Sequence, residues 1–168
     1  TILWNEFENI DIEWTPHSLP NMHLVKLVDF SPHTVAPTTI FSQFTYLQKI
    51  LGNWNIPVGS SRISKLSSQG QVPKHVDIDY YWKHRLRIHI VVQTNPKALF
   101  GCGNHTVHLP EGEVWVSDNW SQHWIANRGI SDRIHIVVDT PGSELIWNWI
   151  HRGWNSDMLS SQTATHNL

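Results

Sequence analysis

The same six-residue sequence, Arg-Ile-His-Ile-Val-Val, occurs twice in this chain, from Arg87 to Val92 and again from Arg133 to Val138. β-Branched residues favour extended strands, in which successive side chains point to opposite faces. Each segment therefore predicts a strand with arginine and histidine on one face and three aliphatic side chains on the other face. If the aliphatic faces pack against a second layer, the basic faces look either into solvent or into the polar interior of a small barrel.

Several other short β-rich runs are separated by Gly, Pro, Asn and Asp, and such a series is typical of a barrel or jelly roll. They cover residues 61–66, 106–109 and 114–117, in addition to 85–93 and 133–139 around the repeated segments, and residues 23–30 also look extended.

Two helices are expected outside these runs. Pro37 to Trp54 has apolar residues at helical spacing, with Gly52 as the expected stop. Ser143 to His151 is predicted to form a second helix, capped by Ser143 and ended near Gly153.

Length and charge restrict the organisation and the partners of the chain. Its 168 residues fit a single domain, which we expect over residues 1–155, followed by a flexible polar tail over residues 156–168. Lys and Arg number 12 against 14 for Asp and Glu, and the resulting net charge of −2 disfavours nucleic acid and membrane surfaces as partners.

Cysteine usage and hydropathy bear on the location. Cys102 is the only cysteine, so an intrachain disulfide is impossible, which fits a reducing, cytoplasmic environment. The sequence has no apolar run near the roughly 20 residues of a spanning helix and no signal-peptide pattern, so a soluble protein is expected.

The chain has 12 histidines, and their spacing has to decide which of them could bind a metal. His75 and Asp77 stand at positions i and i+2 of an extended segment, so their side chains point the same way. A histidine from a distant strand would complete a facial triad of two histidines and one carboxylate, which leaves open positions for a cosubstrate and dioxygen. His123 is the candidate, although His-x-Asp by itself is most often structural.

Arg133 lies ten residues after His123 in an otherwise aliphatic and histidine-containing run. A guanidinium in such a strand needs an acceptor, and its fork geometry matches a carboxylate. The alternative is a buried ion pair within the protein, with Asp132, Asp139 or Glu113 as the acid.

From about Ser61 to Gly142, roughly half of the chain, the sequence resembles the aspartyl/asparaginyl β-hydroxylase-like family of 2-oxoglutarate oxygenases, which includes proline hydroxylases. The motifs that carry the resemblance are Ser64, Gln69-Gly70-Gln71-Val72, His75-Val76-Asp77, Arg85-Leu86-Arg87-Ile88-His89, Glu111 to Trp115, His123 with Asn127, and Asp132-Arg133 leading to Asp139. The sequence departs from the animal aspartyl hydroxylases in a longer segment after His75 and in having Asp77, which they replace with a non-ligating residue.

The resemblance implies a mainly β fold, a double-stranded β-helix (jelly roll, cupin-like) with a few flanking helices. It implies a dioxygenase that uses iron(II), 2-oxoglutarate and dioxygen and releases succinate and carbon dioxide. The metal ligands would be His75, Asp77 and His123. Arg133 would bind the distal carboxylate of 2-oxoglutarate, and the further cosubstrate contacts would be Ser64, His89 and Arg87.

The family acts on amino-acid carbons, free or in peptides, so the resemblance implies a substrate of that class. Tyr80, Tyr81 and Trp82, with Arg85, are the predicted substrate contacts, because their segment directly follows the metal-binding motif and offers aromatic faces and donors. Packing of these aromatic residues against their own domain is the alternative.

The C-terminal tryptophans also have two interpretations. The helix that carries Trp147, Trp149 and Trp154 is expected to be buried against the barrel, and a lid or a homodimer contact is the alternative.

Two other functions compete with the oxygenase. The first is a cupin-like metal enzyme without 2-oxoglutarate, which would not need Arg133, and the second is a non-enzymatic sugar- or peptide-binding jelly roll. A zinc hydrolase has less support, because nothing in the sequence resembles its general base.

Overall fold

The computed structural model describes residues 2–31 and 34–160, without the side chains of 31, 80 and 153–160. Its strands are β1 Thr15–Pro16, β2 Met22–Ser31, β3 Thr34–Pro37, β4 Ser61–Leu66, β5 Gln71–His75, β6 Leu86–Gln93, β7 Ala98–Cys102, β8 His105–Val107, β9 Val114–Ser117, β10 His123–Asn127 and β11 Arg133–Thr140. Its helices are α1 Ile2–Glu8, α2 Thr45–Trp54 and α3 Glu144–Ser160, with the 3₁₀ turns η1 Phe41–Gln43 and η2 Tyr80–His84.

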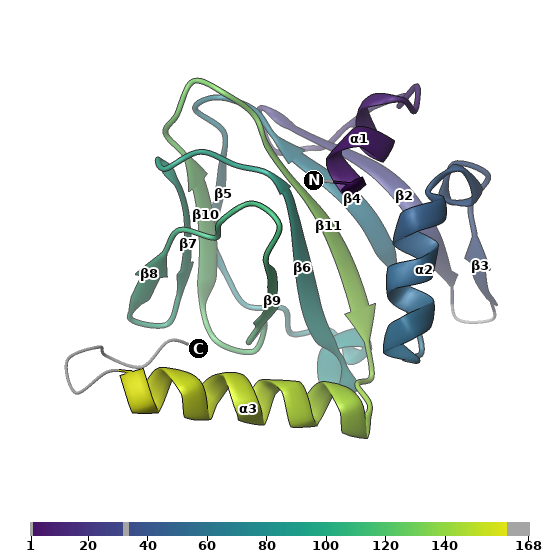
Figure 1. The fold of residues 1–168 in the computed structure, drawn as a ribbon. Helices are drawn as coiled ribbons and strands as arrows, with labels where there is room; N and C mark the ends of the chain where they lie inside the picture. The colour runs from purple at the N-terminus through teal and green to yellow at the C-terminus, as the bar shows by residue number, and fades with distance from the viewer. Residues whose placement is uncertain (1, 32–33, 161–168) are drawn as a thin grey trace.

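The strands form two antiparallel sheets (Figure 1). The larger sheet has the order β1-β2-β4-β11-β6-β9, with β3 also paired to β2, and the smaller sheet has the order β5-β10-β7-β8. Within the described residues no strand pairs across the two sheets, so they do not close into one hydrogen-bonded barrel. The predicted mainly β, jelly-roll class is confirmed, in this open form.

The two repeated segments form β6 and β11, which are neighbours in the larger sheet. Their aliphatic faces join one core with α1, α2 and the start of α3, in which Ile136 and Leu47 are fully buried. Their basic faces are buried too: His135 is 0% exposed and Arg133 3% exposed. The polar-interior interpretation of these strands is therefore confirmed, and the solvent-facing alternative is wrong.

The helix predicted over Pro37 to Trp54 starts later than expected, at Thr45, after the separate turn η1. Its first turn is capped by Glu6 of α1, whose carboxylate accepts from the backbone N–H groups of Tyr46 and Leu47 at 2.7 and 3.2 Å. This cap comes from a distant part of the chain, so local spacing does not show it. The helix ends beyond Gly52, with Asn55 in the left-handed conformation.

Ser143 precedes α3 as predicted, and its hydroxyl accepts from the Ile146 N–H at 3.3 Å. The helix does not end near Gly153 but continues to Ser160, over part of the predicted tail. Residues 161–168 of that tail lie outside the described part of the chain. None of the helices described has both the length and the apolar character needed to span a membrane.

Candidate metal centre

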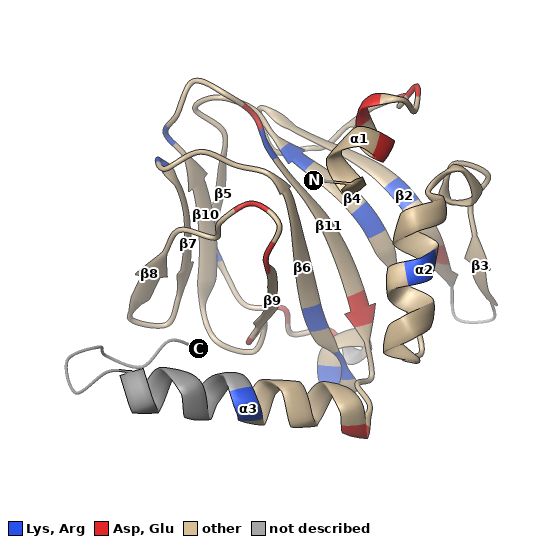
Figure 2. Cartoon of the chain, viewed as in Figure 1, with Lys and Arg blue, Asp and Glu red and all other residues tan. Residues whose placement is uncertain are grey.

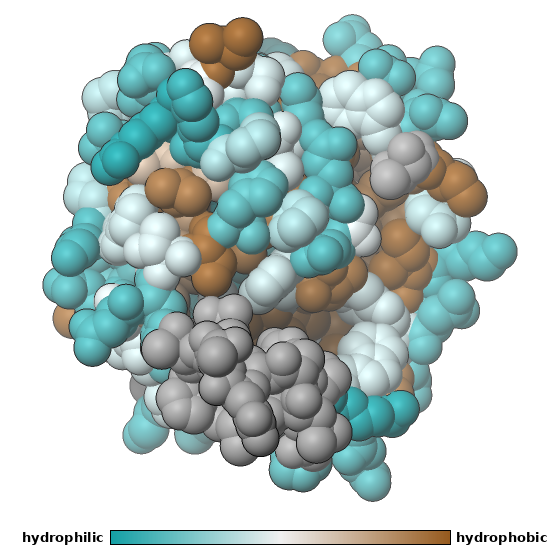
Figure 3. Space-filling model, turned by 60° about the vertical axis from the view of Figure 1, so that its left-hand side comes forward, coloured by the Kyte–Doolittle hydropathy of each residue, from teal (hydrophilic) through white to brown (hydrophobic). Residues whose placement is uncertain are grey.

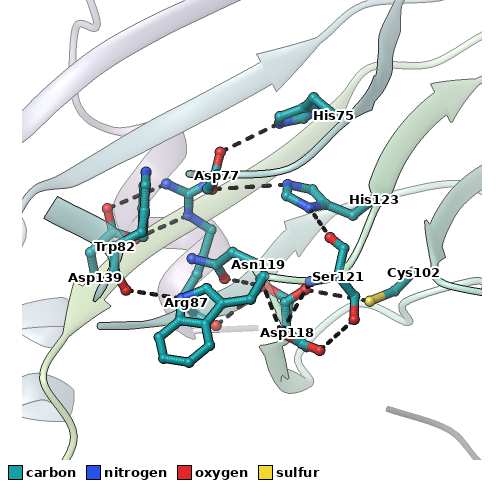
Figure 4. A network of polar contacts seen from close by, with 12 residues as sticks. His75, Asp77, Trp82, Arg87, Cys102, Asp118, Asn119, Ser121, His123 and Asp139 are labelled. Atoms are coloured by element: carbon teal, nitrogen blue, oxygen red, sulfur yellow. Dashed lines mark hydrogen bonds and ion pairs between the residues drawn. The ribbon is translucent and has the colours of Figure 1, made fainter. Parts of the chain in front are cut away.

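The three residues predicted to hold a metal lie together at the ends of two strands. His75 ends β5, His123 begins β10, and the two are partners in the antiparallel register. The Nε2 atoms of His75 and His123 lie 3.6 and 3.9 Å from the carboxylate oxygens of Asp77 (Figure 4). One ligand atom from each residue lies within 4.8 Å of the others, close enough for a single cation to contact all three.

Backbone carbonyls hold both histidine rings in a metal-binding orientation. The Nδ1 of His75 lies 2.8 Å from the Pro73 carbonyl, and the Nδ1 of His123 lies 3.0 Å from the Ser121 carbonyl. Because a carbonyl can only accept, each Nδ1 carries a proton and each Nε2 is left free for a metal. Burial lowers the pKa of His123, which favours the neutral form that binds metals.

Arg87 links the carboxylate of the candidate centre to a second, buried carboxylate. Its Nη1 donates to Asp77 at 3.2 Å, while its Nε and Nη2 donate to Asp139 at 3.0 and 3.4 Å. The guanidinium also lies over the Trp82 ring, 4.2 Å from its centroid. Figure 2 shows this pairing of charge as a basic band on β6 beside the acidic end of β11. Arg87 lines the cavity as predicted for a cosubstrate contact, but two carboxylates already occupy its donors.

A cavity of about 550 Å³ opens beside these residues, with walls from strands of both sheets. It is lined by the predicted metal ligands and also by Arg133, Ser64 and His89, which are buried. The structure thus places all the residues predicted for the metal and the cosubstrate around one space.

The Arg133 guanidinium has no carboxylate partner among the described residues. Its hydrogen-bond partner in the described part of the chain is His135, whose Nδ1 lies 3.0 Å from Nη2 of Arg133. Burial lowers the pKa of Arg133 to about 9, so the group is still charged at neutral pH. Asp139, one of the acids considered for an internal pair, instead binds Arg87.

His89 is a second polar group of the cavity that lacks a partner. It is 4% exposed, and neither ring nitrogen has a hydrogen-bond partner in the part of the chain that the structure describes. Burial, reinforced by the positive charge of Arg133, holds its pKa well below the usual value, so the ring is neutral. Buried polar atoms are normally satisfied, so His89 fits a ligand that supplies a donor or acceptor.

The predicted substrate contacts are not all on the cavity. Trp82 lines it, whereas the Tyr81 hydroxyl accepts from the Ser60 N–H at 2.9 Å. Arg85 stacks on Phe30 and Tyr81, with its Cζ 4.8 and 4.1 Å from the ring centroids. Tyr81 and Arg85 therefore pack on their own domain, which is the alternative considered for this segment. The Tyr80 side chain lies outside the described part of the structure.

Sequence reasoning missed Arg62 and Asn119. Arg62 lines the cavity from β4, two residues before Ser64 and therefore on the same face of the strand, a spacing that could have identified it. Its Nη1 lies 3.9 Å from Asp139, and burial lowers its pKa to about 10. Asn119 supports the centre through its backbone carbonyl, which accepts from the backbone N–H of Asp77 at 3.1 Å. No local motif in the sequence indicates this contact.

The C-terminal helix packs on the core as expected. Ile146 is 1% exposed and Ile150 packs on the same core, and the Trp149 ring lies edge-on to Trp54, with the ring centroids 5.8 Å apart. Trp147 is 52% exposed, so it adds less to this packing. The Trp154 side chain lies outside the described part of the structure.

Comparison with known proteins identifies both a sequence family and a fold. The family model described as aspartyl/asparaginyl beta-hydroxylase matches residues 7–141. A 2OG-Fe(II) oxygenase family oxidoreductase from Burkholderia pseudomallei superposes with a TM-score of 0.60 at 9% identity, over 78% of this chain and 73% of that chain. The Cnp3 cupin domain of Schizosaccharomyces pombe superposes with a TM-score of 0.51 at 10% identity, over 85% of this chain and 76% of that chain. At these identities the likeness shows the fold, a cupin-like double-stranded β-helix.

Proposed function

Because the chain belongs to the aspartyl/asparaginyl β-hydroxylase family, we propose that it is an iron(II)- and 2-oxoglutarate-dependent dioxygenase. Its reaction is the hydroxylation of a carbon in an amino acid or peptidyl residue, coupled to conversion of 2-oxoglutarate to succinate and carbon dioxide. The observation that carries the proposal is the buried Arg133 guanidinium, which has no carboxylate partner among the described residues and lines the same cavity as the candidate metal centre.

The donor set fits iron(II). Two imidazole nitrogens and one carboxylate form the facial triad of non-haem iron oxygenases, which leaves positions for other ligands. His75, Asp77 and His123 would hold the ion, with the Nδ1 hydrogen bonds of both histidines keeping Nε2 directed at it.

The charges around the cavity favour an anionic cosubstrate. Three arginines, Arg62, Arg87 and Arg133, line it, and within the described part of the chain the carboxylates beside them are Asp77 on the cavity and Asp139 behind it. The cavity therefore has a net positive charge before a divalent metal is added, and a dicarboxylate would offset the excess.

Each remaining group has a role in orientation. Arg133 would receive the distal carboxylate of 2-oxoglutarate, for which its planar fork is suited, while Ser64 and His89 would contact the same molecule. Iron, 2-oxoglutarate and dioxygen supply the oxidising chemistry when bound. Trp82, 9% exposed on the cavity wall, would limit the access of water to that chemistry.

The experiment is an anaerobic titration of the protein with iron(II), with and without 2-oxoglutarate, monitored through the weak visible charge-transfer band of the chelate. A band in the wild type that requires much higher 2-oxoglutarate in Arg133→Gln, at unchanged iron affinity, supports the proposal. Folded protein that binds iron without a band would instead favour a cupin-like enzyme without 2-oxoglutarate, and protein that binds no iron would favour a ligand-binding jelly roll.

A further inference from the structure

A second, smaller cavity lies beside the metal cavity, where the two sheets do not close. Its volume is about 60 Å³, and its walls come from β6, β7, β8 and β9 together with Leu109. β8 is an end strand of the smaller sheet and β9 an end strand of the larger sheet, and within the described residues the two do not pair (Figure 1). We call this space the seam cavity.

Most of the wall of the seam cavity is apolar. Phe100 and Cys102 line it from β7, and Val107, the cross-strand partner of Phe100, lines it from β8. Leu109 and the ring-bearing Trp115 of β9 add further apolar surface. Because successive strand residues point to opposite faces, the partners Phe100 and Val107 lie on the same face of the smaller sheet.

The polar groups of the wall offer little to water. The Cys102 thiol donates to a backbone carbonyl at 3.5 Å, and the Ser117 hydroxyl donates to Oδ1 of Asn119 at 3.3 Å. Of the two histidines in the wall, His89 also lines the metal cavity and His105 is half-buried on the end strand β8. A buried water needs two to four polar partners, whereas apolar cavities stay dry and accept small apolar molecules.

The seam cavity leads from the surface toward the metal centre. Val107 on the end strand is half-buried, whereas Phe100 is 7% exposed. His89, Phe100 and Ser117 line both the seam cavity and the metal cavity, so the two spaces adjoin at these side chains. The Phe100 ring also stacks on that of the candidate ligand His123, with the centroids 6.3 Å apart and the planes inclined by 24°.

The size of the seam cavity and the surface around it favour a small occupant. A volume of about 60 Å³ accepts a molecule of a few heavy atoms and is too small for an amino acid. Figure 3 turns the side of the molecule with β8 toward the viewer, and its apolar side chains appear there as separate patches among hydrophilic ones. Interfaces for large partners have broader, contiguous apolar patches.

We infer that the seam cavity is the route by which dioxygen reaches the metal centre. Dioxygen is small and apolar, so its transfer from water into this wall is favourable. In the proposed reaction the metal cavity holds 2-oxoglutarate and the carbon to be oxidised, and a separate apolar route lets the third reactant arrive while both are bound. The identity of the gas rests on the proposed function, but the binding of a small apolar molecule does not.

Xenon tests the cavity directly, because it occupies dry apolar cavities and needs no iron. The methyl signals of Leu109 are followed by NMR in the metal-free protein under xenon pressure, with Ile130, 98% exposed, as the internal reference. Val107→Phe places an aromatic ring in the cavity. Thr106→Phe is the matched control, because Thr106 is the exposed neighbour on the same strand and does not line the cavity.

We expect xenon-dependent shifts at Leu109 in the wild type and in Thr106→Phe, and their loss in Val107→Phe. Val107→Met, whose flexible side chain can fill the same space, replaces Val107→Phe if that variant does not fold. The apparent KM for dioxygen in succinate formation should rise about threefold or more in the filled variant, while the KM for 2-oxoglutarate stays near wild type.

Two results would overturn the inference. One is a wild-type protein whose Leu109 signals do not respond to xenon. The other is an unchanged KM for dioxygen in a folded variant that no longer binds xenon. Because xenon binding is measured without iron, a missing iron–2-oxoglutarate band would overturn the proposed function and leave the xenon result intact.

Discussion

Arg87 donates a hydrogen bond to Asp77 at 3.2 Å, while the rest of its guanidinium binds the buried Asp139. The ion pair between Arg87 and Asp139 therefore fixes the group that holds the carboxylate of the candidate metal centre. Groups that orient metal ligands commonly change metal affinity by about 10- to 100-fold when they are altered. In Arg87→Lys the charge is kept, but an ammonium cannot match the planar fork that spans both carboxylates. We therefore expect iron(II) affinity to fall by about 10- to 100-fold.

The measurement is an anaerobic iron titration, with Arg85→Lys as the control. Arg85 lies two residues earlier, stacked on Phe30 and Tyr81, and its Nη1 donates to the Tyr81 carbonyl. Wild-type iron affinity in Arg87→Lys would show that Asp77 takes its position without this contact.

Replacing either histidine of the triad should abolish turnover while leaving the protein folded. The main core lies on the other face of the larger sheet, so His75→Ala or His123→Ala removes a ligand without disturbing that packing. Asp77→Ala should lower activity by at least about 100-fold, because the carboxylate both ligates and neutralises charge. Succinate formation and far-UV circular dichroism on the same preparations check this. Coupled turnover in a variant would show that the replaced residue is not a metal ligand.

Arg133→Gln should weaken 2-oxoglutarate selectively. Loss of a charged partner in a sheltered pocket is worth about 2 to 5 kcal/mol, or about 30-fold to several thousandfold in affinity. The ligand-free protein should not lose much stability, because Arg133 has no acid partner in the described structure and its charged form is disfavoured by burial. The 2-oxoglutarate dissociation constant and the melting temperature are measured together. A large fall in melting temperature with unchanged 2-oxoglutarate affinity would make Arg133 a structural residue.

Much of the fold and of the candidate site could be predicted from local patterns. Alternation along the repeated segments predicted the strands β6 and β11 and a basic face on each. The bounds of β4 and β9 match the runs expected at 61–66 and 114–117. The i, i+2 spacing of His75 and Asp77 predicted that their side chains lie together. The resemblance indicated His123 as the third member of the group, and the three residues do lie together in the structure.

Arg62 could have been identified from its spacing on β4, but the other parts that were missed depend on contacts between distant residues. The start of α2 is set by the Glu6 carboxylate, about forty positions away in the sequence. The role of Arg87 depends on Asp139 being its cross-strand partner on β11. For the same reason a run of aromatic residues could not show that Tyr81 faces its own domain while Trp82 faces the cavity.

These different positions of Tyr81 and Trp82 predict different effects. Tyr81→Phe removes the hydroxyl that accepts from the Ser60 N–H and should lower the free energy of unfolding by about 1 kcal/mol. Trp82→Ala opens the cavity wall and removes the ring over Arg87, so the ratio of hydroxylated product to succinate should fall. Denaturant titration and product analysis on both variants check this. A lower product ratio in Tyr81→Phe, with unchanged stability, would return Tyr81 to the substrate site.

The buried histidines of β6 and β11 predict that the metal-free protein loses stability in mild acid. Burial, together with the charge of Arg133, holds the pKa values of His89 and His135 well below the usual value. His135 also accepts from Arg133 through Nδ1, which requires that nitrogen to be unprotonated. As the pH falls below about 6.5, the unfolded chain binds protons at these histidines that the folded chain does not bind, so the free energy of unfolding decreases.

The expected slope is about 1.4 kcal/mol per pH unit for each histidine, fully developed below a pH of about 5.5 and absent well above pH 7. Urea unfolding of the metal-free protein at several pH values measures it. His135→Gln should reduce the slope, since a glutamine side chain does not titrate. If His135→Gln kept the full wild-type slope, His135 would have to be protonated in the folded protein, and its hydrogen bond with Arg133 could not exist as described.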